Sequence, residues 1–188
     1  SVAVFAVNKD GSLDSAKQIT EHTGYSVNTE RQTAPHVHAT VLSKENNFLM
    51  VPDLGIDKIM IYPFNAKTGK LDEANAGFVP TEPGSGPRHF DFHPSGKFGY
   101  LMEELTGTVS VYNYYKKTGA LEQVQTISGI PVDYMGPIGS ADIHVSPDGK
   151  FLYCSNRGES NNIGIFSIDK KTGRLRLIGH QSVLGKTP

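Results

Sequence analysis

Two arginines and a glutamate are the residues of this sequence best suited to chemistry. Arg88 follows Pro87, Arg157 precedes Gly158, and Glu104 follows a second acid, Glu103. A carboxylate between two guanidinium groups has a lowered pKa and stays ionised, and the same arginines can bind an anionic substrate through paired hydrogen bonds. Glu104 could therefore activate a water molecule or remove a proton, while a histidine donates or accepts one.

Each of these residues also has a purely structural interpretation. Arg88 and Arg157, next to Pro and Gly, could be loop clamps that bind backbone carbonyls. Glu104, next to Glu103, could be a solvated turn carboxylate. Sequence position alone does not decide between these roles and catalysis.

The histidines supply further candidates. His36 and His38 are expected on the same side of one strand, where they resemble half of a zinc site. No matching third ligand is evident, so the expected site contains no metal and no cofactor. His93 is predicted to brace the turn at Ser95. The residues expected to bind substrate beside the catalytic group are His36, His89, Asp142 and His144.

A repeat explains how residues so far apart can meet. The pattern Lys-Thr-Gly-x-Leu occurs at residues 67–71, 117–121 and 171–175. An alternating strand precedes each copy, and an aromatic-led strand lies further upstream, at residues 48–51, 98–101 and 151–154. Each unit thus contains about four short strands joined by tight turns, which is typical of a β-propeller blade. A β-sandwich with accidental similarity is the competing interpretation.

The expected fold is an all-β propeller of four-stranded antiparallel blades, forming one domain. Its blade repeats are expected at residues 1–34 (partial), 35–86, 87–140 and 141–188. The chain begins at the third strand of a unit, so it holds about three and a half blades. We expect a fragment of a longer protein, whose remaining blades are its partners. The irregular stretches 23–35 and 129–140 connect blades and cover one face.

Superposing the units selects the candidate site. His38, Arg88 and Ala141 occupy one repeat position, and Leu54, Glu104 and Arg157 occupy another. The start of the first strand and the turn after the second strand fall at the same end of a blade. Loops at one end of all blades meet over the central channel, so His36, His38, Arg88, Glu104 and Arg157 are predicted to surround one pocket.

Composition excludes several functions. With 18 basic and 19 acidic side chains, the chain has no excess charge for a nucleic acid partner. It contains no apolar run of membrane-spanning length and no secretory-type segment. The one cysteine, Cys154, is expected to be a buried strand residue, which allows a reducing compartment. The expected location is the cytoplasm.

The same residues resemble those of the lactonase family of seven-bladed propellers. This family includes bacterial 6-phosphogluconolactonases and the fungal 3-carboxy-cis,cis-muconate lactonizing enzyme. The resemblance implies that the family's histidine is His38 or His36, its arginines Arg88 and Arg157, and its glutamate Glu104. The similar stretches are Arg31-Gln32, residues 35–38, 53–55, 84–89, 104–105, 143–149 and 155–158.

Two residues depart from the family pattern. Glu103 stands where Asn is frequent, and Asp142 stands where Glu is frequent. An acid beside Glu104 is expected to raise a pKa in the site.

The activity implied by the resemblance is hydrolysis of a sugar lactone, foremost 6-phosphoglucono-δ-lactone. The substrate class is therefore a small anionic lactone or sugar acid. Two alternatives stay open at this point. One is a muconate-type lactonizing cyclase that uses the same groups, and the other is a propeller that only binds or acts as a scaffold.

Overall fold

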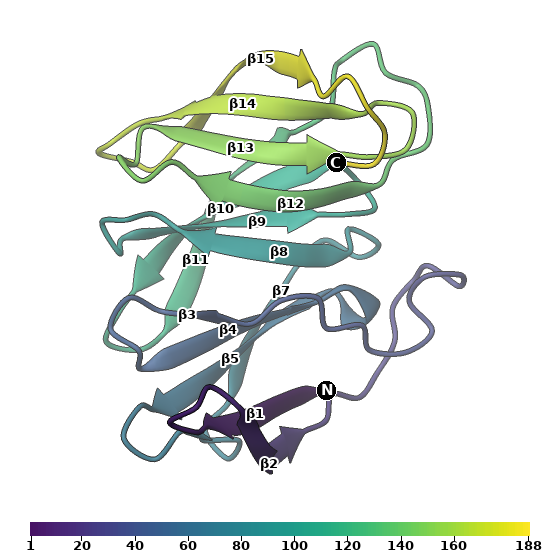
Figure 1. Cartoon of the computed structure of the whole chain (residues 1–188). Helices are drawn as coiled ribbons and strands as arrows, with labels where there is room; N and C mark the ends of the chain where they lie inside the picture. The colour runs from purple at the N-terminus through teal and green to yellow at the C-terminus, as the bar shows by residue number, and fades with distance from the viewer.

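The computed structural model describes all residues, 1–188, and consists of antiparallel sheets that follow one another along the chain (Figure 1). The first sheet is the hairpin β1 (Val2–Val7) and β2 (Leu13–Thr20). The last two sheets are four-stranded meanders. They consist of β8 (Pro87–Phe92), β9 (Phe98–Glu103), β10 (Thr108–Tyr115) and β11 (Ala120–Ser128), then β12 (Ser140–Val145), β13 (Phe151–Asn156), β14 (Asn162–Ile168) and β15 (Leu175–Ser182).

The second sheet is a variant of the same meander, in which the outermost strand is broken. Its elements are β3 (Val41–Leu42), β4 (Phe48–Asp53), the 3-10 turn η1 (Leu54–Ile56), β5 (Lys58–Asn65), β6 (Lys70–Leu71) and β7 (Gly77–Pro80). Both β6 and β7 pair with β5. In the later sheets the outermost strand is continuous, and a bulge lies at the corresponding place, between Val111 and Tyr112 and between Ile165 and Phe166. The break is thus an enlarged bulge.

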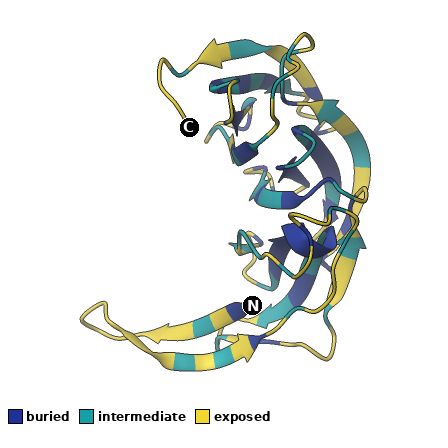
Figure 2. Cartoon of the chain, turned by 90° about the vertical axis from the view of Figure 1, so that its right-hand side faces the viewer, coloured by how far each residue is buried: buried dark blue, intermediate teal, exposed yellow.

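The hydrophobic core consists of separate clusters, each of which lies between two neighbouring sheets. One cluster joins the third and fourth sheets through residues such as Tyr100 and Phe166, and another joins the second and third through Met50 and Tyr112. A third cluster joins the N-terminal hairpin to the second sheet. Figure 2 shows the sheets arranged along an arc, with buried residues concentrated between them. The all-β fold of successive antiparallel sheets predicted from the repeat is confirmed, as is the burial of Cys154, which is 1% exposed.

The Lys-Thr-Gly turns hold neighbouring blades together. Each forms the hairpin between the two outer strands of its blade, as predicted. Gly119 lies against the ring of Phe48 in the preceding blade, and Gly173 lies against the ring of Phe98 in the same way. Two glutamine side chains add inter-blade amide pairs: Gln18 bonds both backbone groups of Leu71, and Gln125 bonds those of Leu175.

We expect Gly173→Ala to destabilise the protein more than Gly69→Ala. Both glycines have left-handed φ, of 70° and 67°, which costs about 1–2 kcal/mol for alanine. A Cβ at Gly173 would lie 2.5 Å from the Phe98 ring, whereas Gly69 faces open space. Overpacking adds about 1–3 kcal/mol. Urea unfolding of both variants measures the difference in the free energy of unfolding. If both variants lose the same free energy, the Phe98 ring can move aside for the added methyl group.

The turn between β8 and β9 is held by the side chain of His93. The His93 ring accepts from the backbone N–H of Ser95 through Nδ1, at 3.0 Å, and its Nε2 donates to the carbonyl of Gly149 at 2.9 Å. His93 therefore braces its own turn, as predicted, and also ties it to the next blade.

No helix of the structure has the length and apolar character needed to cross a membrane.

The expected strand through His36 and His38 is wrong. Only an isolated bridge joins Val37 to Asp53, and β3 begins later, at Val41. The Asp53 carboxylate accepts from the backbone N–H groups of His36 and Gly55, at 2.6 and 3.0 Å. Because the carboxylate binds the N–H of His36, pairing with β4 is limited to the bonds from His38 N–H to the carbonyl of Pro52, at 3.3 Å, and from Leu54 N–H to the carbonyl of His36, at 3.0 Å.

Candidate active site

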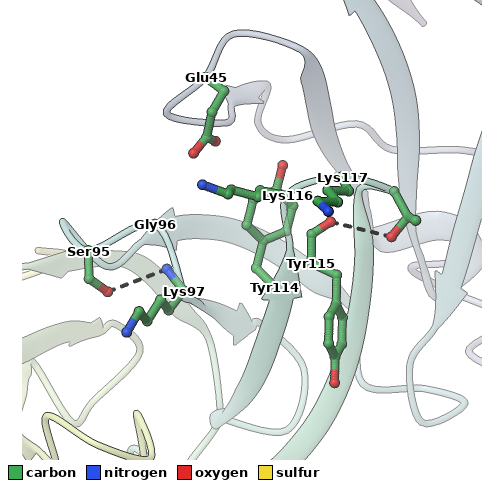
Figure 3. A pocket seen from close by; sticks show the side chains of 9 residues that line it. Glu45, Ser95, Gly96, Lys97, Tyr114, Tyr115, Lys116 and Lys117 are labelled. Carbon is green, nitrogen blue, oxygen red and sulfur yellow. Dashed lines mark hydrogen bonds between the residues drawn. The ribbon is translucent and has the colours of Figure 1, made fainter.

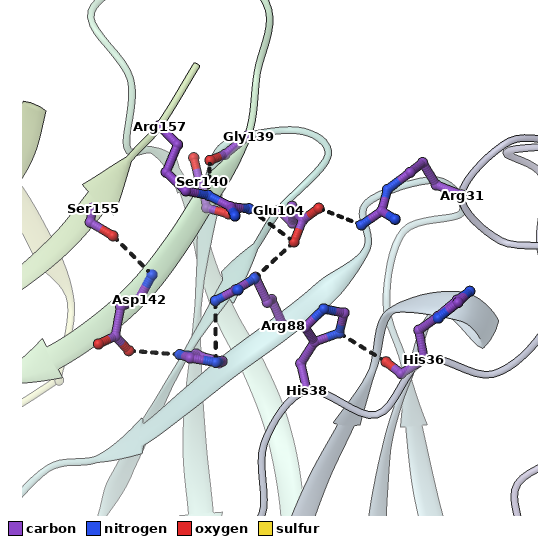
Figure 4. A network of polar contacts seen from close by, with 11 residues as sticks. Arg31, His36, His38, Arg88, Glu104, Gly139, Ser140, Asp142, Ser155 and Arg157 are labelled. Atoms are coloured by element: carbon purple, nitrogen blue, oxygen red, sulfur yellow. Dashed lines mark hydrogen bonds and ion pairs between the residues drawn. The ribbon is translucent and has the colours of Figure 1, made fainter. Parts of the chain in front are cut away.

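The Glu104 carboxylate is bound by three arginines from three parts of the chain (Figure 4). Its Oε2 accepts from Arg88 Nε at 2.8 Å and pairs with the Arg157 guanidinium at 3.2 Å. Its Oε1 accepts from Arg31 at 2.7 Å. The predicted meeting of Arg88, Glu104 and Arg157 is therefore present in the structure, with one more arginine than expected.

The position of Glu104 follows from the ends of two blades. It comes directly after β9, where its backbone N–H donates to the carbonyl of Gly86 at 2.8 Å. Its own carbonyl accepts from the backbone N–H of Ser140, at the start of β12, at 3.2 Å. The Glu104 side chain is only 9% exposed. The interpretation of Glu104 as a solvated turn carboxylate is therefore wrong.

The two predicted arginines differ in how they are held. Arg157 also donates to the carbonyls of Gly139, at 2.9 Å, and Ser140, at 3.4 Å. It is thus both a loop clamp and a partner of Glu104. Arg88 makes no bond to a carbonyl, and its second partner is the ring of His89, at 3.2 Å.

Glu104 is ionised because of its arginines. Burial acts to raise the pKa of its carboxyl group. The hydrogen bond and charge of Arg31, followed by the charges of Arg157 and Arg88, outweigh burial and lower the pKa below its ordinary value. Three guanidinium groups against one carboxylate leave two positive charges without an acidic partner in this cluster.

The expectation that Glu103 raises a pKa in this site is wrong. Its carboxylate points away from the arginines and accepts from the hydroxyl groups of Thr108 and Ser110. Burial raises the pKa of Glu103 itself. The two adjacent acids therefore have separate environments, and the arginine cluster contains Glu104 alone.

Arg31 is the residue that sequence reasoning missed as a site residue. It lies in the connection between β2 and β3, outside the repeated strands, so superposing the blades does not select it. Its backbone N–H donates to Asn28 Oδ1 at 3.0 Å. Next to it, the fully buried Gln32 donates to the carbonyl of Leu54 at 2.8 Å. The signal that could have identified Arg31 is its place in the connection 23–35, which is expected to cover one face of the propeller.

His38 lies beside Arg88, as predicted, whereas the ring of His36 points to another side (Figure 4). The His38 Nδ1 donates to the carbonyl of His36 at 3.0 Å, which leaves Nε2 free as an acceptor. Burial lowers the pKa of His38, partly offset by that carbonyl, and the charge of Arg88 lowers it further. His38 is therefore neutral at neutral pH.

The two rings do not form half of a metal site, because they point to different sides (Figure 4). No group of three or more His, Cys, Asp or Glu side chains is arranged to hold a metal ion.

The other predicted substrate-binding residues form a chain that starts at Arg88. Because an arginine can only donate, His89 accepts through Nε2 and donates from Nδ1 to Asp142 at 2.7 Å. The second oxygen of Asp142 lies 2.9 Å from His144 Nε2. Burial acts to raise the pKa of Asp142, but the hydrogen bond from His89 and others lower it overall.

His89, Asp142 and His144 line a hollow of about 340 Å³ along the inner strands. The structure thus brings His89, Asp142 and His144 together beside the arginine cluster, whereas the ring of His36 lies apart from them.

Comparison with known proteins identifies the family of the chain. The family model described as lactonase, 7-bladed beta-propeller, matches residues 1–188. The chain belongs to the seven-bladed lactonase family. The lactonase-family chain is 38% identical over 187 residues to a 6-phosphogluconolactonase of Bacillus subtilis. The alignment includes 100% of this chain and 52% of that relative. It is 39% identical to a 6-phosphogluconolactonase of Formosa agariphila, of which it covers 53%.

Solved structures of the family superpose closely on the chain. The periplasmic gluconolactonase PpgL of Pseudomonas aeruginosa matches with a TM-score of 0.91 and 39% identity, over 99% of this chain and 51% of that one. The propeller fold predicted from the repeat is therefore confirmed. The lactonase-family chain spans about half the length of the relatives it matches. The compartment expected from the sequence stays a prediction.

A second groove of the lactonase-family chain lies apart from the arginine cluster, at the turns on the opposite ends of the blades (Figure 3). Its volume is about 510 Å³, and it contains none of the predicted site residues. The residues that line it are Glu45, Ser95, Gly96, Lys97, Tyr114, Tyr115, Lys116, Lys117 and Thr118.

Proposed function

We propose that the protein containing this chain hydrolyses a sugar lactone that carries a negative charge, foremost 6-phosphoglucono-δ-lactone. The observation that carries the proposal is the buried, ionised Glu104 between three arginines. A carboxylate needs a free acceptor position to take a proton from water, and Oε1 has one, since it accepts a single hydrogen bond. The names of the Bacillus and Formosa relatives point to the same substrate class.

In the proposed reaction Glu104 takes a proton from a water molecule, whose oxygen forms a bond to the lactone carbonyl carbon. Arg88 and Arg157 stabilise the negative charge that develops on the carbonyl oxygen. The bond from the carbonyl carbon to the ring oxygen then breaks, and the ring oxygen takes the proton. The product is the open hydroxy acid. Water adds across one bond, and no electrons are transferred to or from the substrate.

His38 assists the transfer of the proton to the ring oxygen. Its neutral ring has one unpaired nitrogen, Nε2, which can accept a proton and pass it on. The chain Arg88–His89–Asp142 fixes the tautomer of His89 and the direction of the Arg88 guanidinium. Asp142, His89 and His144 then contact the sugar hydroxyl groups in the adjoining hollow.

The full-length protein should accelerate the opening of 6-phosphoglucono-δ-lactone above its spontaneous rate. The assay follows acid release at a pH where spontaneous opening is slow, with unphosphorylated glucono-δ-lactone as the second substrate. We expect a higher kcat/KM for the phosphorylated lactone, because the arginine cluster has positive charge to spare. Rates at background level for both lactones would refute the proposal and favour a propeller that only binds.

A further inference from the structure

Arg31 differs from the other two arginines in how weakly its side chain is held. Its guanidinium has one partner, Glu104 Oε1, and its side chain is 46% exposed. Arg88 and Arg157 are 17% and 28% exposed, and each has at least one further partner. Arg31 is therefore the arginine that can change partners at the lowest cost.

The backbone that carries Arg31 is fixed. Asn28 Oδ1 accepts from the backbone N–H of Arg31, and the backbone N–H of Gln32 donates to the carbonyl of Asn28 at 2.8 Å. Gln32 is fully buried and anchors the loop to Leu54. A change of partner thus requires only a new side-chain rotamer and no movement of the loop.

The bond that Arg31 makes is the one that matters for proton transfer. Glu104 Oε2 already accepts a hydrogen bond from Arg88 and forms an ion pair with Arg157, so it is the more occupied of the two carboxylate oxygens. Oε1 is the oxygen that can take a proton, and Arg31 is its only protein donor. While Arg31 stays there, it withdraws charge from the atom that must act as the base.

The charges define what can move Arg31. The cluster has two positive charges in excess. A phosphate monoester carries about two negative charges at neutral pH, so it would neutralise them. A guanidinium group binds two phosphate oxygens in a paired geometry. A phosphorylated substrate therefore offers Arg31 a better partner than one carboxylate oxygen, and an uncharged lactone offers none.

We propose that Arg31 senses the phosphate group of the substrate by leaving Glu104 Oε1 to bind it, and thereby makes Glu104 a stronger base. This inference rests on the proposed function. Arg31 is a specificity-determining residue here: it binds the remote anion, and it acts on the reacting water only through Glu104. Recognition of the phosphate and activation of the base become one event, which favours the phosphorylated lactone over its neutral analogue.

The test compares Arg31→Ala with wild type on the phosphorylated and the unphosphorylated lactone, in the full-length protein. We expect kcat/KM for 6-phosphoglucono-δ-lactone to fall about 10- to 100-fold, as for a lost charged hydrogen bond. For glucono-δ-lactone kcat should rise, because Glu104 Oε1 no longer shares its charge with Arg31. The acid limb of the pH profile should move to higher pH, because Glu104 loses the largest influence that lowers its pKa. Arg174→Ala, at an exposed arginine next to the 171–173 turn, is the matched control and should change neither substrate.

Equal losses on both lactones, or a pH profile that does not move, would overturn the inference. Binding of the reaction products, measured by calorimetry, separates this outcome from failure of the proposed function, because it needs no turnover. We expect Arg31→Ala to weaken binding of 6-phosphogluconate about 10-fold or more and to leave binding of gluconate unchanged. A wild-type protein that does not prefer 6-phosphogluconate to gluconate would contradict the role of Arg31 even if it hydrolyses lactones.

Discussion

Replacing Glu104 by glutamine should reduce lactone hydrolysis about 100- to 10,000-fold, the usual contribution of a positioned general base. The amide has the shape of the carboxylate but cannot take a proton from water. It also carries no negative charge to offset any of the guanidinium groups, so Arg31, Arg88 and Arg157 repel one another more strongly in the variant. We therefore expect a lower melting temperature together with the loss of kcat.

The matched control for this experiment is Glu103→Gln. Glu103 is the adjacent residue, it is equally buried, and its partners are the hydroxyl groups of Thr108 and Ser110. Those hydroxyl groups can bind an amide as well as an acid, so activity should stay near the wild-type value. If Glu103→Gln and Glu104→Gln lose activity equally, the loss reflects packing, and Glu104 is not the base.

The pH dependence expected for the wild-type protein follows from the same contacts. The pKa of Glu104 is lowered, so the carboxylate that must accept a proton persists to a pH below the ordinary range of a glutamate. The pKa of His38 is lowered as well, so its neutral form also persists on acidification. Activity is therefore expected to be retained through mildly acidic pH and lost only as pH falls through these two lowered values.

The repeat made much of this site predictable. Because equivalent blade positions meet at one end of a propeller, the positions of Arg88, Glu104 and Arg157 in the repeat were enough to place them together. This required no knowledge of side-chain contacts. The same reasoning gave the Lys-Thr-Gly hairpins and the local brace of His93 on its own turn, since turn residues act locally; the bond from His93 to Gly149 of the next blade was not predicted.

Residues outside the repeat were not predictable in this way. Arg31 reaches Glu104 only because Gln32 anchors the connection to Leu54, which is a contact between distant parts of the sequence. His36 lies on no regular strand, because Asp53 binds its backbone N–H in place of a ladder bond. Such side-chain to backbone bonds decide the path of a loop, and a strand pattern contains no record of them.

The separation of Glu103 from Glu104 has a simpler cause. Successive side chains of a strand point to opposite faces, and Glu103 is the last residue of β9. Because Glu104 faces the arginines, its neighbour points to the other side, where Thr108 and Ser110 of the adjacent strand β10 bind it. The influence expected from an adjacent acid therefore fails because adjacency along a strand separates side chains rather than bringing them together.

Replacing Arg88 by methionine should lower kcat/KM about 100- to 1,000-fold, which is typical for loss of a donor that stabilises developing negative charge. Methionine keeps the apolar stem of this mostly buried side chain but removes its bonds to Glu104 and His89. His89 then loses one of the two bonds that hold its ring and keeps only the bond from its Nδ1 to Asp142. Kinetics and thermal unfolding of the variant measure both consequences.

Arg157→Met separates charge stabilisation from loop clamping. Arg157 makes the same kind of contact to Glu104, but it also bonds the carbonyls of Gly139 and Ser140. Each lost bond of this kind costs about 1 kcal/mol, so Arg157→Met should lower stability more than Arg88→Met while reducing kcat/KM to a similar extent. Loss of stability without loss of activity would make Arg157 a clamp only. In that case the developing charge on the lactone oxygen would depend on Arg88 alone, and Arg88→Met would then abolish the reaction.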